Sequence, residues 1–398
     1  MSMTRGQIAL LAGFSALAPM AIDMYLPALA PLASDLGVSV DRAGQSISMF
    51  LFGLAGGQIV AGPLSDRVGR RPVFLIGLLL FLGGAVAAAV TGSFAVLLAA
   101  RLAQAFGACS VMVAGRAIVR DRMEANEAAR FFSLLALIGG LAPVLAPLIG
   151  ALLIQLGDWR LTFWVMAGFA GLLFFSGIAV MSESRSTETA KTARQENPFS
   201  AYRALLTNPA LLGYLLTSMF NSAAFFSYVA NSSVVMVDSY GLTPLQFSLV
   251  FGVNSVALIG AAQLNRAMLK SRNVPQLLRV SSRNAVMLAL LLLIFTIVQP
   301  VTGNFWIFAI LLFFMVGSIS PVQANSMAGG LAVDALRSGS TAALFGACTF
   351  AGGAIASWLA GLLYDGTSRG LSLVVAICLL GVAGAIRFIV LRTPAQPV

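Results

Sequence analysis

The stretch AIDMYLPALAP, residues 21–31, places a single carboxylate, that of Asp23, inside an otherwise apolar run. The chain contains no His, and no Glu falls within an apolar run, so Asp23 is the one clear group there that can take up and release a proton. Another apolar run carries the opposite charge of Arg101. An ionisable group inside a membrane costs several kcal/mol unless it faces a polar cavity or a partner. The two residues therefore predict proton chemistry, with Arg101 as the partner of Asp23.

The elements that must position these charges are membrane-spanning helices. Of the 398 residues, 59% are hydrophobic and only 10% are charged, whereas globular domains carry about a quarter charged residues. The mean hydropathy is +0.93. A helix needs about 20 apolar residues to cross a bilayer. We predict an all-α membrane protein with twelve such helices, near residues 7–30, 44–64, 73–91, 95–116, 131–154, 161–181, 208–230, 243–264, 280–299, 304–324, 341–363 and 371–391.

Asp23 and Arg101 are predicted to lie at similar depths in the membrane. Asp23 precedes Pro31, at the outer end of the first span, by eight residues, which is about 12 Å along a helix. Arg101 follows the start of the fourth span by about seven residues, or about 10 Å. Pro19 and Pro27 bracket Asp23 and remove backbone donors, as in the helix breaks that line cavities. The alternative is a buried ion pair that only fixes helix packing.

The distribution of Lys and Arg predicts the orientation of the chain. Twenty of the 24 basic residues lie on one side of the predicted spans, and only Arg42, Arg160 and Arg369 lie on the other. This asymmetry places both termini in the cytoplasm. It also accounts for the net charge of +10 without a nucleic-acid partner, since the charges are spread over many short inner loops. No metal-ligand cluster and no cofactor motif is found, so we expect that the protein binds no metal or cofactor and is not an enzyme.

A polar stretch divides the chain into two halves. Residues 182–208 separate six predicted spans from six, and the segments AGPLSDRVGRRP (61–72) and AAQLNRAMLKSR (261–272) form a weak internal repeat. Parallel repeated halves, with substrate sites near the membrane midplane, characterise one large transporter fold. We therefore predict an N-terminal six-helix bundle at 1–181, a cytoplasmic linker at 182–207 and a C-terminal six-helix bundle at 208–398.

The loop GPLSDRVGRRP (62–72) resembles the signature loop of the major facilitator superfamily. The resemblance implies the major facilitator fold and a gating loop. In physical terms, two glycines let the backbone turn, Asp66 pairs with a neighbouring Arg or caps the next helix, and the arginines hold the loop at the inner lipid surface. A basic loop that only sets the orientation is the alternative. The gating residues would be Gly62, Asp66, Arg67, Gly69, Arg70 and Arg71.

Three further resemblances narrow the family. RLAQAFGA (101–108) resembles the start of span 4 in the drug:proton antiporter branch, where the matching Arg is tied to proton coupling. GGLAPVLAPLIGALL (139–153) is similar to the span 5 motif of the same antiporters, with Ala142 in place of the usual glycine. IDMYLPALA (22–30) resembles the Bcr/CflA subfamily, which includes bicyclomycin and phenicol exporters. These resemblances imply proton coupling by Asp23 and Arg101, and a conformational switch helix that contains Gly139, Gly140, Pro143 and Pro147.

Aromatic and uncharged polar residues inside the predicted spans are candidates for substrate contact, because such a mixture suits an amphipathic, uncharged ligand. Polar residues also serve contacts between membrane helices, which is the alternative. The candidates are Tyr25, Asn221, Phe225, Tyr228, Asn254 and Gln323.

With the resemblances, these residues lead us to expect a monomeric, proton-coupled antiporter of the cell inner membrane. Its partners would be the lipid bilayer and a small-molecule substrate, namely small amphipathic compounds or antibiotics that it exports. One alternative is a proton-coupled permease or exporter of a metabolite such as a nucleoside, sugar or amino acid. Another is a channel or membrane scaffold that retains the fold without coupling.

Overall fold

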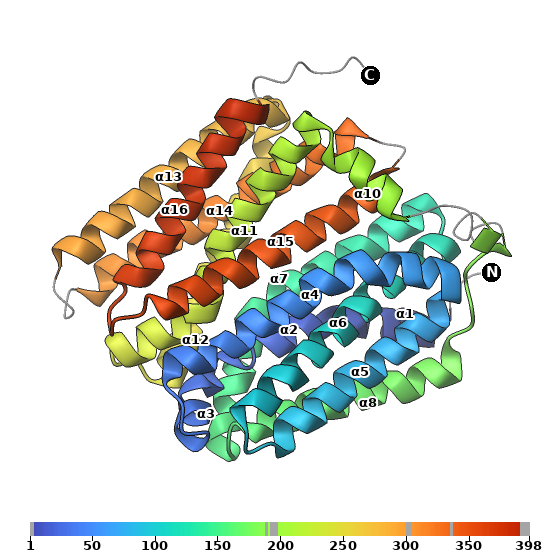
Figure 1. Ribbon diagram of the computed structural model, residues 1–398, viewed down its shortest axis with the longest axis horizontal. Helices are drawn as coiled ribbons and strands as arrows, with labels where there is room; N and C mark the ends of the chain where they lie inside the picture. Colours follow the sequence, from blue (N-terminus) through green and yellow to red (C-terminus); the bar gives the residue numbers. More distant parts are fainter. Residues whose placement is uncertain (1–3, 188–189, 192–197, 300–303, 335–336, 391–398) are drawn as a thin grey trace. The chain divides into compact units, whose positions relative to one another are not determined.

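The computed structural model describes residues 4–187, 190–191, 198–299, 304–334 and 337–390, and this part of the chain consists of helices and short connections (Figure 1). Eleven helical stretches in it are long and apolar enough to cross a membrane. A twelfth apolar helix, α16 (Arg369–Ala385), is shorter and continues as the π-helical turn Ile386–Val390. The predicted all-helical architecture is therefore confirmed.

The first span is broken around Asp23. It consists of α1 (Arg5–Gly13), α2 (Leu17–Ile22) and α3 (Leu29–Asp35), joined through the 3₁₀ turns Phe14–Ala16 and Leu26–Ala28. Because Pro27 has no N–H, it cannot bond the Asp23 carbonyl as an α-helix requires. That carbonyl instead accepts a hydrogen bond from Leu26 N at 3.4 Å, in the tighter 3₁₀ pattern. The break that the two prolines predicted is thus present.

The described chain forms two compact units. The first comprises Met1–Ser39 with Met49–Pro198, and the second comprises Val40–Ser48 with Phe199–Val398. The predicted bundles, 1–181 and 208–398, and the predicted linker, 182–207, stay predictions about domain organisation. Residues 188–189 and 192–197 of that linker lie outside the described residues.

In the first unit, α5 lies between α6 and α8 (Figure 1). The long helices of this unit are α5 (Arg70–Val90), α6 (Phe94–Arg122), α7 (Ala125–Leu156), α8 (Arg160–Val180) and the part of α4 (Val40–Val68) from Met49 onward.

In the second unit, α11 packs against α14, α15 and α16. The helices here are α10 (Pro198–Leu206), α11 (Pro209–Ser233, followed by the π-helical turn Val234–Ser239), α12 (Pro244–Met268), α13 (Val274–Val298), α14 (Phe305–Val333), α15 (Ser338–Leu362) and α16.

Glycines bring the backbones of α5 and α6 into contact. A Cβ atom at Gly107 would overlap the backbone nitrogen of Phe81 and the carbonyl oxygen of Gly77, and a Cβ at Gly84 would lie 2.7 Å from the carbonyl oxygen of Ala100. Small residues of this kind allow close helix packing in membranes, where lipid competes with apolar side chains. The position of α6, which carries Arg101, therefore depends on these glycines.

We expect Gly107→Ala to lower the thermal unfolding midpoint of the detergent-solubilised protein, by about 2 to 6 °C, because the overlapping atoms belong to backbone that cannot move alone. Gly83→Ala is the matched control, since a Cβ there meets nothing within 4 Å. Equal midpoints for the two variants in a thermal shift assay would contradict the proposed close packing.

Candidate functional site

Asp23 lies at the C-terminal end of α2, where the first span is broken, and only 7% of its surface is exposed. Helix α7 packs directly against this break. A Cβ atom at Gly150 of α7 would overlap the carbonyl oxygen of Met24, so the two backbones touch. The carboxylate therefore sits at an irregular point of the backbone that a neighbouring helix covers.

Arg101 is fully buried on α6 and bonds to the same break. Its guanidinium donates one hydrogen bond to the carbonyl oxygen of Ala21 at 2.7 Å and one to Gln104 Oε1 at 2.7 Å. The last carbonyls of a helix have no partner within the helix, and α2 ends at Ile22, so Arg101 supplies what Ala21 lacks. Its Nε has no hydrogen-bond partner among the described residues.

The direct pairing expected for Asp23 and Arg101 is wrong for this conformation. Both side chains are described, and no ion pair joins them. Equal depth brings two helices to one level of the membrane but does not decide which way each side chain turns. The structure brings the two charges to one helix break, with Arg101 bonded to the backbone two residues before Asp23.

Three aromatic rings surround the Arg101 guanidinium. Its central carbon lies 4.4 Å from the ring centre of Phe50, 4.9 Å from that of Tyr25 and 5.8 Å from that of Phe163. Cation–π attraction of this kind grows when water is excluded. Tyr25, a candidate for substrate contact, is itself fully buried and packs on Phe163 with ring centres 5.1 Å apart.

Two of the other substrate candidates meet in a polar cluster of the second unit. Asn221 Nδ2 of α11 donates to Gln323 Oε1 of α14 at 3.3 Å and to the carbonyl oxygen of Ile319 at 3.1 Å. Gln323 also bonds Ser218 and Ser222. The Oδ1 atom of Asn221 is buried and has no partner among the described residues. An unmatched buried acceptor costs about 1 to 3 kcal/mol, so it favours a donor from a ligand or water.

The remaining candidates form a second cluster on α11 and α12. Asn254 Nδ2 donates to the hydroxyl of Tyr228 at 3.0 Å. Tyr228 stacks on Phe251 with ring centres 5.5 Å apart, and Phe225 lies 6.5 Å from Tyr228. The structure therefore groups these candidates into two uncharged polar clusters, whose contact with substrate stays a prediction.

The predicted gating loop turns at only one of its two glycines. Helix α4 ends at Val68, Gly69 adopts φ = +130°, which favours glycine, and α5 begins at Arg70. The expectation that Gly62 also turns the chain is wrong, because Gly62 lies inside α4 with Pro63 after it. The helix runs past the signature glycine and ends one turn later than expected.

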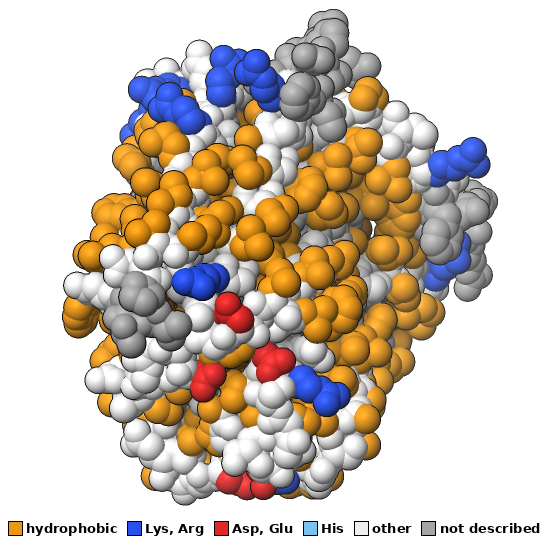
Figure 2. Space-filling model, turned by 60° about the vertical axis from the view of Figure 1, so that its left-hand side comes forward, with side chains coloured by type: hydrophobic (Ala, Val, Ile, Leu, Met, Phe, Trp, Pro, Cys, Tyr) orange, Lys and Arg blue, Asp and Glu red, His pale blue; other side chains and the backbone are white. Residues whose placement is uncertain are grey.

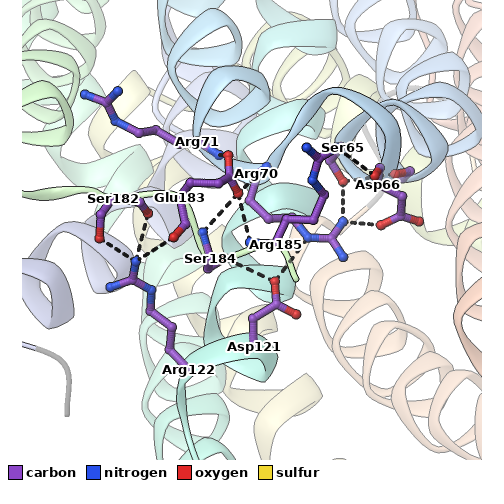
Figure 3. A network of polar contacts seen from close by, with 11 residues as sticks. Ser65, Asp66, Arg70, Arg71, Asp121, Arg122, Ser182, Glu183, Ser184 and Arg185 are labelled. Atoms are coloured by element: carbon purple, nitrogen blue, oxygen red, sulfur yellow. Dashed lines mark hydrogen bonds and ion pairs between the residues drawn. The ribbon is translucent and has the colours of Figure 1, made fainter. Parts of the chain in front are cut away.

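Arg70 is the centre of the loop. It forms ion pairs with Asp66 and, at 3.2 Å, with Asp121 Oδ2 of α6, and it donates to Ser65 Oγ at 2.7 Å (Figure 3). Of the two roles expected for Asp66, the pairing with a neighbouring Arg is the one observed. The expectation that Arg70 holds the loop at the lipid surface is wrong, since Arg70 is 6% exposed and its charge is neutralised within the protein.

The other two arginines of the loop differ from Arg70 in their surroundings. Arg71 donates to the carbonyl oxygen of Ile178 at 3.3 Å, which ties the start of α5 to α8. Arg67 is exposed, and its carbonyl oxygen accepts a hydrogen bond from Arg185 Nη1 at 2.5 Å.

Residues just after α8 complete the loop, and the sequence did not reveal them. The Glu183 carboxylate accepts four backbone N–H bonds, which cap the start of α5 and its own turn (Figure 3). The donors are Arg70 at 3.0 Å, Arg71 at 3.3 Å, Ser184 at 2.9 Å and Arg185 at 2.9 Å. Partial burial raises the pKa of the Glu183 carboxyl, but these N–H bonds outweigh it and hold the pKa below its ordinary value.

The C-terminal end of α6 also forms hydrogen bonds with the segment that contains Glu183. Arg122 donates to the carbonyl oxygen of Ser182 at 2.9 Å, and Ser184 Oγ donates to Asp121 Oδ2 at 3.1 Å. We call residues 182–185 the clasp. The signal that could have revealed the clasp is its place: Glu183 directly follows a span on the Arg-rich side of the chain.

The four residues of the predicted switch helix all lie in α7, which is continuous from Ala125 to Leu156 with two prolines inside it. The same helix contains Gly150, which touches Met24 beside Asp23. Its role as a conformational switch stays a prediction.

The clasp predicts a stability that depends on pH. Because the pKa of Glu183 is lowered in the folded protein, its contribution is complete above the ordinary value of 4.5 and is lost as the pH falls through the lowered pKa. We expect Glu183→Gln to lower the thermal midpoint by about 2 to 4 °C at pH 7, as for the loss of a helix cap. The difference from the unsubstituted protein should shrink as the pH falls below 4.5, the ordinary pKa of Glu.

Glu124→Gln is the control, since Glu124 precedes α7 and makes no side-chain cap bond. Thermal unfolding of both variants between pH 3 and pH 7 measures the effect. A Glu183→Gln midpoint that follows the unsubstituted protein at every pH would contradict the capping role.

Comparisons with known proteins place this geometry in a family. The chain is 32% identical over 355 residues to YdgK of Bacillus subtilis, an uncharacterized MFS-type transporter, covering 89% of this chain and 88% of the relative. It is 30% identical over 352 residues to a bicyclomycin resistance protein homolog of Haemophilus influenzae, covering 86% and 85%. The crystal structure of a D-xylose-proton symporter shares the fold, with a TM-score of 0.73 at 15% identity over 94% of this chain and 96% of that one. A family model described as Major Facilitator Superfamily matches residues 11–356, so the chain belongs to this superfamily of membrane transporters.

Proposed function

We propose that this transporter is a drug:proton antiporter of the Bcr/CflA type, which exports small amphipathic, largely uncharged compounds across the inner membrane in exchange for protons. The observation that carries the proposal is the place of Asp23. Among the acidic residues of the described chain, it alone lies away from the ends of a membrane span, and it is buried at a helix break. Intramembrane carboxylates of this kind are typical of proton relays.

Arg101 gives the proposed proton step a means of control. It is bonded to the backbone of the break that carries Asp23, through Ala21. A rearrangement of the break changes the distance between the guanidinium and the carboxylate. The energy difference between the protonated and ionised forms of Asp23 changes with that distance. Asp23 would thus load and release its proton as the first span moves.

If one proton is exchanged in each cycle, its free energy sets the upper limit for the gradient of substrate. A charge moved through 100 mV supplies about 2.3 kcal/mol, so a proton motive force near 150 mV supplies about 3.5 kcal/mol. That free energy sustains a gradient of about a few hundredfold for a neutral compound. A monovalent cation exchanged for one proton moves no net charge and would use only the pH gradient.

The two polar clusters of the second unit favour an uncharged substrate. The cluster of Asn221 and Gln323 and the cluster of Tyr228 and Asn254 consist of amides, hydroxyls and aromatic rings. They offer hydrogen bonds and apolar surface but no charge. The name of the Haemophilus relative, a bicyclomycin resistance protein homolog, supports antibiotics as the substrate class.

Proton release from inside-out vesicles tests the proposal. The vesicles are energised to be acid inside, and chloramphenicol-like, bicyclomycin-like and cationic dye compounds are added in turn. We expect at least one uncharged compound to trigger proton efflux, and Asp23→Asn to abolish that efflux because the amide cannot carry a proton. Asp365→Asn, an exposed carboxylate in the connection before α16, should keep it.

Efflux that survives in a folded Asp23→Asn protein would contradict the role of Asp23 as proton carrier and leave it a structural residue. Silence with every drug, in unsubstituted protein that is folded, would contradict drug export. It would favour a metabolite permease of the same fold.

A further inference from the structure

A patch of positive charge at one end of the second unit has no role in the proposed transport cycle. It spans the last turn of α12, the connection to α13 and the first turns of α13, and every one of its basic side chains is exposed. We call it the basic patch: Arg266, Lys270, Arg272, Arg279 and Arg283. In Figure 2, Lys and Arg side chains gather at the upper end of the face shown, whereas the visible Asp and Glu side chains lie in its lower half.

The basic patch lacks negative partners. None of its five side chains forms an ion pair or hydrogen bond with another residue that the structure describes. The sequence contains no acidic residue between Asp238 and Asp334. Arg279 and Arg283 are four residues apart on one helix, and like charges at that spacing destabilise a helix. The patch therefore carries uncompensated repulsion.

The internal repeat shows that the membrane orientation alone does not explain why the basic patch lacks negative partners. In the first unit, the corresponding loop also carries arginines, but Asp66 and Asp121 neutralise Arg70. In the second unit, Arg266 stands at the repeat position of Asp66, 200 residues later. Orientation requires positive charges on both loops. The orientation does not require that carboxylates neutralise an arginine in one loop while the other loop has no carboxylate.

The apolar surface beside the basic patch suits the acyl part of a lipid. Leu264 and Leu269 are 62% and 41% exposed, and Met287, one turn after Arg283, is 55% exposed. A ligand that fits both features has a negatively charged head and an apolar tail. Basic clusters next to membrane spans attract anionic lipids, at about 1 kcal/mol for each Lys or Arg near the membrane surface.

We propose that the basic patch binds the phosphate groups of anionic phospholipids, with the neighbouring leucines against their acyl chains. The phosphates replace the carboxylates that the first unit supplies to its own loop. Binding here stabilises the second unit and does not depend on which compound the protein transports.

Titration of the purified full-length chain in neutral detergent tests this site. The probes are short-chain phosphatidylglycerol, short-chain phosphatidylcholine and inorganic phosphate, and the thermal midpoint reports binding. We expect phosphatidylglycerol to bind and to raise the midpoint, with little effect from the other two. In Arg279→Gln/Arg283→Gln its apparent dissociation constant should rise about 25-fold, which is about fivefold for each cation removed.

Arg203→Gln/Arg337→Gln is the matched control. It removes two exposed cations outside the basic patch, of which Arg337 pairs with Asp334, and should change the constant less than about twofold. If the double variant of the patch does not fold, Arg283→Gln alone should give the fivefold change. Equal binding of the two lipids, equal binding by patch variant and control, or displacement of phosphatidylglycerol by equimolar phosphate would each overturn the proposal.

Discussion

The arrangement of the first unit depends on how a broken backbone is satisfied inside a membrane. Each unpaired N–H or C=O group costs several kcal/mol in hydrocarbon, so a span that breaks at Asp23 needs partners from its neighbours. Arg101 donates one hydrogen bond to the Ala21 carbonyl near the end of α2, and α7 contacts Met24 through Gly150. The fully buried Arg101 guanidinium also packs against three aromatic rings. The charge of Arg101 and the close contact with α7 thus both stabilise the helix break at Asp23.

The two copies of the internal repeat hold their helix ends in different ways. In the first unit, Ser65 of α4 accepts a hydrogen bond from Arg70, and two carboxylates and the clasp complete the contact. At the repeat position in α12, Asn265 instead exchanges two amide hydrogen bonds with Asn325 of α14, at 3.4 and 2.8 Å. Charged contacts respond to pH and salt, whereas an amide pair responds to neither. The two helix ends are therefore stabilised by different kinds of contact.

Much of this fold could be predicted from the sequence because membrane helices leave strong signals. Long apolar runs gave the helices, and Pro19 and Pro27 predicted the break at Asp23. Spacing along the sequence could not predict the direction in which each side chain points around its helix axis. Asp23 and Arg101 lie at one break as their depths suggested, yet the guanidinium turns to the Ala21 carbonyl.

The clasp was missed for a different reason. Glu183 lies far from Arg70 in the sequence and follows a span in a polar stretch, where its charge looked like that of a solvated linker. Gly62 was misjudged because a glycine in a membrane helix does not have to turn the chain. Among the substrate candidates, the polar residues of α11, α12 and α14 were found by type, but their grouping into two clusters needed the three-dimensional contacts.

The clasp also has a consequence for biosynthesis. The backbone N–H of Arg70 donates to a carboxylate 113 residues further along the chain, just after α8. A ribosome adds about 5 to 20 residues each second, so the loop between α4 and α5 waits several seconds in the membrane before Glu183 reaches it. Until then, the backbone N–H groups of Arg70 and Arg71 at the start of α5 lack the carboxylate that caps them in the folded protein. The start of α5 is therefore capped only after α8, the last long helix of the first unit, has been synthesised.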